Sequence, residues 1–255
     1  GIALTEINNQ SFNSIVAKAE DKWEKELDKI EINTNVKAFA TKFYTALYRT
    51  ALAPVIYSDQ DGTYQNQQGQ INQMPNGKKR YTIFSLWDTF RALNPLFTIT
   101  QTILVPELIN SMLQFYKENG LLPVWDISTW EANTMTGYHA IPVIADAILK
   151  DIKGFNVDTA YAAMLKSAHQ QQRGTQDYIK HGYLPQDKHG WSVTITLEYA
   201  YDDWCIAQVA KKLGKTNDYD LLMQRAKSYQ NIFDKATGFM RAKNSQGKFI
   251  EPFDP

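Results

Sequence analysis

Apolar residues recur at steps of three and four along most of the chain, which is the period of an amphipathic helix. The pattern predicts helices over 16–30, 36–52, 104–116, 141–152, 160–168 and 222–233. The segment 192–213 is apolar almost all round, which indicates a buried helix. Asn119 and Gly120 form a C-cap signal after the third helix, and Asp158 is the expected N-cap of the helix over 160–168.

Strand signals are confined to two insertions. Turn-forming dipeptides such as Asp61-Gly62 separate short β-prone pieces over 57–83, which predicts a hairpin. A polar stretch between apolar ends predicts a second hairpin over 239–249. Asp59 and Asp61 are similar to the start of a calcium loop, but the glutamate that ends such a loop is missing, so we interpret them as turn residues.

Buried and amphipathic helices that alternate along a chain are the pattern of an α/α toroid. The predicted fold is therefore all-α, with short β-hairpin insertions. The 27 Lys and Arg residues balance 27 Asp and Glu residues and are scattered, which argues against a nucleic-acid partner. The single cysteine, Cys205, excludes a disulfide framework and is expected to be buried and inert. No window approaches the roughly 18 apolar residues of a membrane span.

The segment 125–139 (WDISTWEANTMTGYH) carries the most informative chemistry. It places the carboxyl group of Glu131 among Trp125, Trp130, Tyr138 and His139. Aromatic rings stack on the C–H faces of sugars, and apolar surroundings favour a protonated carboxyl, as a glycosidase general acid requires. An ordinary junction between a loop and a helix would look similar, so both interpretations stay open. His139 taken alone is more often a core histidine than a catalytic one.

Two further segments gather polar and aromatic side chains. In 84–91 (FSLWDTFR), Asp88 and Arg91 stand three residues apart and are expected to pair beside Trp87, either to bind sugar hydroxyls or as a structural ion pair. The segment 181–192 (HGYLPQDKHGWS) would line the same opening if the helices close into a ring. Asp202 and Asp203 project in different directions from a helix, which favours hydrogen-bonded or solvated carboxylates over a general base.

These segments, together with others in the same order, resemble family 92 of the glycoside hydrolases, the calcium-dependent exo-acting α-mannosidases. The matching blocks are 43–50 (FYTALYRT), 81–91 (YTIFSLWDTFR), 120–125 (GLLPVW), 135–139 (MTGYH) and 142–147 (PVIADA). The resemblance implies an (α/α)6 toroid that follows a β-sandwich domain. We therefore expect residues 1–32 to be a linker strand or helix from a missing sandwich domain, and residues 33–255 to be the first half of the toroid.

The resemblance also implies a reaction and its residues. Members of the family cleave terminal α-mannosides with inversion, using a glutamic acid as general acid, aspartates as general base and calcium to grip the sugar. Matched by motif, the catalytic acid is Glu131, and the substrate-binding candidates are Trp87, Asp88, Arg91, Trp130 and His139. Mannose-containing glycans are the expected partners, and a periplasmic, cell-surface or secreted setting in a bacterium is the implied location.

The chain departs from the family pattern in two ways. Trp130 and Ala132 flank Glu131 where the family has asparagine and threonine, and Asp126 replaces a glutamate, which puts the subsite for the leaving group in question. The segments that supply calcium contacts and the base are not in this chain. We therefore expect calcium ligands mostly outside it, no metal ligand within it, and an inactive fragment. The alternatives are a non-catalytic carbohydrate-binding helical domain, or a toroidal glycosidase or lyase acting on other sugars.

Overall fold

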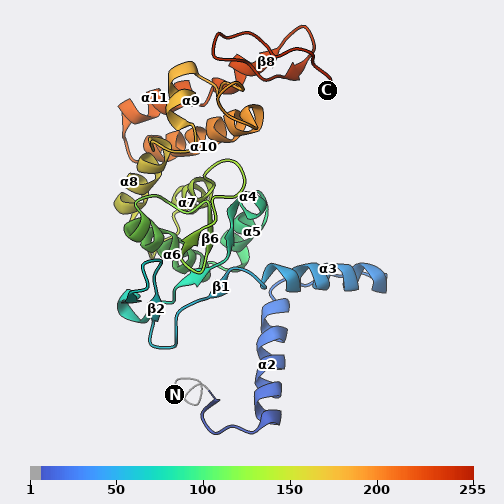
Figure 1. The fold of residues 1–255 in the computed structure, drawn as a ribbon. Helices are drawn as coiled ribbons and strands as arrows, with labels where there is room; N and C mark the ends of the chain where they lie inside the picture. Colours follow the sequence, from blue (N-terminus) through green and yellow to red (C-terminus); the bar gives the residue numbers. More distant parts are fainter. Residues whose placement is uncertain (1–6) are drawn as a thin grey trace.

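The computed structural model describes residues 7–255, so the first six residues of the expected linker lie outside the described part. Two helices at the start, α2 (Phe12–Leu27) and α3 (Lys37–Thr50), project from the other helices (Figure 1) and bury none of their residues. The end of α2 still reaches the body of the fold, where Glu26 accepts a hydrogen bond from the Gln101 side chain. Their positions confirm the helices predicted over 16–30 and 36–52. The role of residues 1–32 as a linker between domains stays a prediction.

The remaining helices form an inner and an outer layer. They are α4 (Leu86–Thr89), α5 (Leu93–Thr100), α6 (Leu104–Asn119), α7 (Ala140–Leu149), α8 (Val157–Ala168), α9 (Thr175–His181), α10 (Ser192–Lys212) and α11 (Thr216–Arg225). The inner helices α7 and α10 pack on each other, and α6, α8 and α11 cover them. Eight of the ten residues of α7 are buried, as an inner helix requires. The arrangement is a partial helical toroid, and the predicted fold class is confirmed.

The core runs through α6, α7, α8 and α10, where Ile109, Ile144, Met164 and Ile206 are fully buried. The predicted C-cap of α6 is confirmed, because Gly120 adopts the left-handed conformation with a φ of 82°. The predicted N-cap of α8 is wrong by two residues. Asn156 caps this helix by accepting a hydrogen bond of 2.7 Å from the Thr159 amide, and Asp158 lies in the first turn.

The helix predicted over 222–233 is displaced, because α11 begins at Thr216. α11 ends at Arg225, and the next turn is the 3₁₀ helix η2 (Ser228–Ile232). The Arg225 side chain turns inward to pair with Asp203 on α10, with 2.8 Å between Nη2 and Oδ1. This contact ties the end of α11 to the inner layer.

The strands are short and lie in loops between helices. β1 (Val55–Ile56) pairs with β4 (Tyr81–Thr82), and β2 (Thr63–Gln65) pairs with β3 (Ile71–Gln73) before the 3₁₀ turn η1 (Pro75–Gly77), which confirms the predicted hairpin over 57–83. Within that hairpin Asp61 accepts hydrogen bonds from the backbone and the hydroxyl of Thr63, as expected of a turn residue. A further sheet, in the order β5-β6-β7, is built from β5 (Phe84–Ser85), β6 (Trp125–Ile127) and β7 (Trp130–Glu131).

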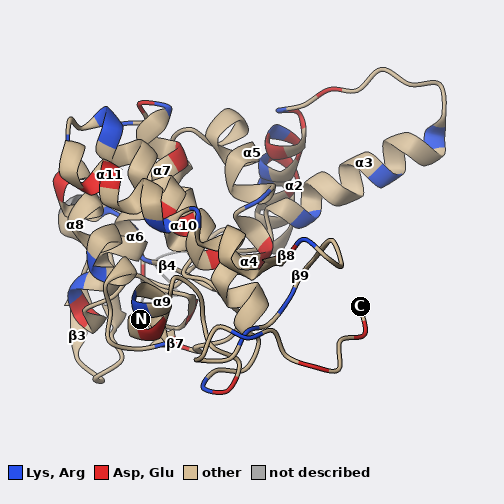
Figure 2. Ribbon diagram, turned by 90° about the horizontal axis from the view of Figure 1, so that it is seen from above, with Lys and Arg blue, Asp and Glu red and all other residues tan. Residues whose placement is uncertain are grey.

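The second predicted hairpin, over 239–249, is confirmed around its turn. Lys243 bridges Phe249 in antiparallel fashion, and the Ile250 amide donates a hydrogen bond of 2.9 Å to the Ala242 carbonyl oxygen. A pairing that the sequence did not predict precedes it, between β8 (Phe233–Asp234) and β9 (Phe239–Met240). Arg241, the residue after β9, lies 2.8 Å from the Asp234 carboxylate and ties the two strands together. Lys and Arg residues are interspersed with Asp and Glu residues in the view of Figure 2. No helix in the described range is long and apolar enough to cross a membrane.

Candidate active site

A cluster of four side chains forms where three elements meet. Trp87 and Arg91 come from α4 and the turn after it, His139 precedes α7, and Glu198 lies on α10. The Glu198 Oε1 atom accepts hydrogen bonds from Trp87 Nε1 at 3.2 Å and from Arg91 Nη2 at 3.0 Å. On the other side, His139 Nε2 lies 2.9 Å from Glu198 Oε2. We call these four residues the Glu198 cluster.

Aromatic packing holds the cluster together. Phe90 is buried, and its ring stacks on the His139 imidazole with 4.1 Å between the ring centroids. The Arg91 guanidinium lies 4.3 Å from the Phe90 centroid and 5.1 Å from the Trp87 centroid. Cation–π contacts of this kind limit the freedom of a half-exposed arginine. The segment 84–91 therefore acts as a rigid unit beside α10.

The second ring nitrogen of His139 is also paired. Nδ1 lies 2.8 Å from Oδ1 of Asp202, which is fully buried one turn after Glu198 on the same face of α10. Burial by itself would lower the pKa of His139, but the Asp202 and Glu198 carboxylates outweigh it and raise the pKa to about 9. Burial likewise opposes ionisation of Glu198, yet His139, Arg91 and Trp87 together lower its pKa. The cluster thus holds the imidazole between two carboxylates, and burial raises the pKa of one of them, Asp202.

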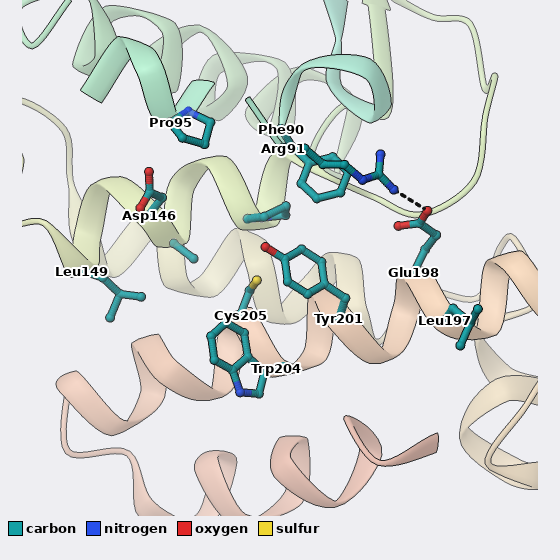
Figure 3. A pocket seen from close by; sticks show the side chains of 12 residues that line it. Phe90, Arg91, Pro95, Asp146, Leu149, Leu197, Glu198, Tyr201, Trp204 and Cys205 are labelled. Carbon is teal, nitrogen blue, oxygen red and sulfur yellow. Dashed lines mark hydrogen bonds and ion pairs between the residues drawn. The ribbon is translucent and has the colours of Figure 1, made fainter. Parts of the chain in front are cut away.

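The cluster forms one end of an open pocket of about 710 Å³ between α5, α7 and α10 (Figure 3). Arg91 and Glu198 are its charged end, and Tyr201 and Trp204 form an aromatic wall. Their rings are stacked at 6.2 Å, and each side chain is about two-fifths exposed, 41% for Tyr201 and 43% for Trp204. A polar end beside an aromatic wall is suited to a sugar, which has hydroxyls on its rim and C–H groups on its faces.

Glu131 lies on β7 and has a different environment. Its carboxylate accepts three backbone hydrogen bonds, from Val124 at 2.7 Å, Trp125 at 3.0 Å and Asn133 at 2.8 Å. It lines a smaller pocket of about 200 Å³ together with Gln67, Asn133, Gln170 and Arg173, among others. Across the described residues, the hydrogen bonds of Glu131 all go to the backbone, and none joins it to the Glu198 cluster.

The β5-β6-β7 sheet links the two segments singled out in the sequence. Ser85 of β5 pairs with Trp125 of β6, and Asp126 of β6 pairs with Glu131 of β7. The middle strand β6 therefore joins β7, which carries Glu131, to β5, which directly precedes Trp87 and Arg91. The structure brings these segments together although about forty positions of sequence, including α6, separate them.

Asp88 and Trp130 lie at the margin of this region. The expected ion pair between Asp88 and Arg91 does not form, because Arg91 is drawn to Glu198 and to the Trp87 carbonyl oxygen, and Asp88 instead pairs with the Ser85 hydroxyl. Trp130 follows the turn after β6 and is 57% exposed. Both remain candidates for substrate binding by motif alone.

Asp126 is a structural residue here. Its buried carboxylate pairs with the buried Arg80 at 2.9 Å and accepts hydrogen bonds from the Thr82 hydroxyl and the Thr129 amide. Burial raises the pKa of Asp126, while Arg80 lowers it in part. Asp126 therefore anchors the turn between β6 and β7, the strand of Glu131.

The segment 181–192 does not join the Glu198 cluster. His181 and His189 gather instead around Asp177, with 2.8 Å between His189 Nε2 and Asp177 Oδ2, and Trp191 is 76% exposed. The sequence reasoning missed Glu198. An available signal was the four-residue spacing between Glu198 and Asp202 inside a helix predicted to be buried, since two buried carboxylates on one face need a cationic partner.

The family model of the glycosyl hydrolase family 92 catalytic domain matches residues 2–255. The chain therefore belongs to glycoside hydrolase family 92. Its backbone is similar to that of a family GH92 alpha-mannosidase from Bacteroides thetaiotaomicron, with 43% identity and a TM-score of 0.95, covering 99% of this chain and 34% of that one.

Two further relatives agree with this assignment. A GH92 inverting mannosidase from Bacteroides thetaiotaomicron VPI-5482 is 30% identical, with a TM-score of 0.92 over 98% of this chain and 35% of that one. An uncharacterized secreted glycosidase of Arthroderma benhamiae is 26% identical over 268 residues, which is 97% of this chain and 30% of the relative. The chain spans about a third of the length of these relatives.

Proposed function

We propose that this chain supplies part of the catalytic domain of an enzyme that hydrolyses terminal α-mannosidic linkages in glycans. The observation that carries the proposal is the backbone match to a family GH92 alpha-mannosidase over 99% of the chain. The same relative has also been solved in complex with mannoimidazole. The Glu198 cluster and its aromatic wall support a sugar ligand on chemical grounds.

In the proposed reaction Glu131 is the general acid. Its carboxyl proton passes to the glycosidic oxygen as the bond to the anomeric carbon breaks, and water attacks the opposite face while a base takes its proton. An inverting mechanism places acid and base roughly 6.5–9.5 Å apart. We propose that the base comes from residues outside this chain, and we expect the 255-residue chain alone to be inactive.

Calcium, which the family resemblance implies, has no assigned ligand here. Within the described part of the chain, no group of three or more His, Cys, Asp or Glu side chains is placed to hold a metal ion. We propose that residues outside this chain supply the calcium ligands. We also propose that the protein is exported, which the description of one relative as secreted supports.

A second candidate function is carbohydrate binding without turnover. One observation favours this second function: the Glu131 carboxylate already accepts hydrogen bonds from three nearby backbone amides. A carboxylate with this pattern of contacts also suits a purely structural role, in which it fixes the turn after β6. The two functions differ in whether Glu131 is needed for release of mannose or only for the fold.

The test uses the complete protein that contains this chain, assayed on aryl α-mannosides and on an α-linked mannose disaccharide. We expect Glu131→Gln to lower kcat on the disaccharide by about a thousandfold, the middle of the range for general acid catalysis. The loss should be smaller on an aryl mannoside with a good leaving group, because such a group needs little protonation.

Glu118→Gln is the matched control. Glu118 lies on α6 and accepts hydrogen bonds from Asn72 and Gln114, so it shares chemistry with Glu131 without sharing its pocket. We expect this variant to keep its activity. Equal effects of the two substitutions would remove Glu131 from the mechanism, and binding of mannosides without release by the unmodified protein would favour the second candidate.

A further inference from the structure

The Glu198 carboxylate has one hydrogen-bonding position left. A carboxylate offers about four lone-pair sites on two oxygens. Oε1 receives two donors, Trp87 Nε1 and Arg91 Nη2, while Oε2 faces a single partner, His139 Nε2. Glu198 lines the large pocket, so the free site on Oε2 is available to a ligand there. An ionised carboxylate accepts and does not donate, and a sugar hydroxyl is a donor that fits it.

The direction of that free site depends on His139. The imidazole lies between Glu198 and Asp202, and the stacked Phe90 ring covers one of its faces. Nε2 and Oε2 stand at ion-pair distance without a well-aligned hydrogen bond, so this contact alone does not fix the ring. The contact between Nδ1 and Asp202 Oδ1 at 2.8 Å is the one that does.

Asp202 is itself held rigidly. Its second oxygen accepts a hydrogen bond of 3.0 Å from the Tyr138 backbone amide, directly before α7. The carboxylate is fully buried and does not line the pocket, and His139 stands between it and Glu198, which does. A carboxylate placed in this way behind a histidine fixes the angle of the imidazole ring.

We propose that Glu198 binds a hydroxyl of the substrate sugar and that Asp202 is a positioning residue, which aims the Glu198 carboxylate through the two nitrogens of His139. The proposal rests on the proposed function for the identity of the sugar. It adds two residues to the site, one that contacts the ligand and one that acts at a distance from it.

The charged groups around His139 come from two elements. Glu198 and Asp202 lie on α10, and Arg91 reaches Glu198 from the segment after α4. Phe90 and Tyr138 supply contacts without a charge. Removing the charge of Asp202 should therefore lower the pKa of His139 toward its ordinary value of 6.5 and leave the other partners in place.

The first experiment measures the imidazole directly. The His139 resonances of the complete protein are titrated by NMR in the unmodified form, in Asp202→Asn and in Asp203→Asn. Asp203 is the next residue, is equally buried and faces Arg225 instead of His139, which makes it a matched control. We expect the His139 pKa to fall in Asp202→Asn and to stay near 9 in Asp203→Asn. The same His139 pKa in the two variants would overturn the proposal.

The second experiment measures catalysis with an aryl α-mannoside. We expect Asp202→Asn to lower kcat/KM by about a hundredfold, chiefly through KM, as a misaimed contact does. Glu198→Gln should raise KM at least as much, and Asp203→Asn should leave KM unchanged once the folded fraction is matched. An unchanged KM in both Glu198→Gln and Asp202→Asn would contradict the assignment.

The two experiments distinguish a failure of the proposed function from a failure of the positioning role of Asp202. If the unmodified protein releases no mannose, the proposed function fails, while the NMR titration still decides whether Asp202 positions His139. If Asp202→Asn does not fold, Asp202→Glu replaces it, since this change keeps the charge and moves it by one methylene group. We then expect a raised KM with a His139 pKa that remains high, and an unchanged KM would overturn the positioning role.

Discussion

Asp202 and Asp203 are neighbours on α10 and equally inaccessible to solvent, yet they belong to different regions of the molecule. Successive residues of a helix point about 100° apart, so the two carboxylates leave α10 on different sides. Asp202 meets His139, and through it Glu198 at the pocket. Asp203 meets Arg225 at 2.8 Å and the Tyr178 hydroxyl at 3.0 Å, inside the layer formed with α9 and α11.

The difference lies in the partners. Asp202 pairs with an imidazole, whose charge can change and which leads outward to Arg91, a side chain that is 52% exposed. Asp203 pairs with a guanidinium, which stays charged, and burial raises its own pKa to about 7 despite that partner. The same residue type therefore serves a site on one side of the helix and holds helices together on the other.

The largest effect on stability is expected for Arg225, and Arg91 provides the contrast. Arg225→Met would leave Asp203 buried without its cation, which should lower the free energy of unfolding by about 3–5 kcal/mol. Arg91→Met removes a half-exposed charge and should cost less than about 1 kcal/mol, while it raises KM for a mannoside. Denaturant unfolding and steady-state kinetics on both variants provide the test. Similar losses of stability in the two would abolish the distinction.

The next effect concerns pH. The His139 pKa is raised to about 9 in the folded protein from an ordinary 6.5, so its contribution to stability is complete below pH 6.5 and is lost as the pH rises through 9. We expect the free energy of unfolding to fall by on the order of 3 kcal/mol over this window from His139 alone. His139→Gln should remove that part of the fall, and His189→Gln should retain it. Identical pH profiles would show that the Glu198 cluster does not hold a charged imidazole.

A smaller effect is expected from removal of single hydrogen-bond donors. Tyr178→Phe leaves the buried Asp203 with one donor fewer and should cost about 1–3 kcal/mol of stability. Trp87→Phe removes a donor to Glu198 at the rim of the pocket, where water replaces it, and should change stability less while KM rises. Thermal unfolding of the pair separates the two regions, and a larger loss from Trp87→Phe would reverse the comparison.

The smallest effect is expected at the far end of the pocket. Lys150 pairs with Asp146 at 2.8 Å, but both side chains are partly exposed. Lys150→Met should change stability by less than about 1 kcal/mol, because screening by water weakens such pairs. A loss as large as that of Arg225→Met would mean that exposure does not separate structural from peripheral charges in this protein.

Helix periodicity predicted the long helices of the two layers but not the short helices α5 and α9. The apolar stripes that predict α6, α7 and α10 are buried as expected, since an apolar stripe has no other stable location. Cys205 is also buried as predicted, and burial raises the pKa of its thiol. The pattern did not predict β8, which pairs with β9 at the start of the predicted hairpin segment.

The site was only partly accessible from the sequence. Motifs pointed to Trp87, Arg91 and His139, and the structure brings these three together. Their common partner, Glu198, lies more than fifty positions after His139 and had no motif of its own. The spacing of Glu198 and Asp202 indicated a buried pair of carboxylates, but only the packing of α10 against α7 shows which cation they meet. The prediction that Asp88 pairs with Arg91 was wrong. It considered only the local spacing along the chain, whereas Arg91 pairs with Glu198 from the distant helix α10.

The most direct test of the proposed function follows the product of a methyl α-mannoside by proton NMR in the complete protein. Inversion at the anomeric carbon requires β-mannose to appear first and the α-anomer to accumulate only as the sugar equilibrates. We predict this order, with both signals strongly reduced in Glu131→Gln. Initial appearance of α-mannose, or undiminished release by the variant, would contradict an inverting mechanism with Glu131 as its acid.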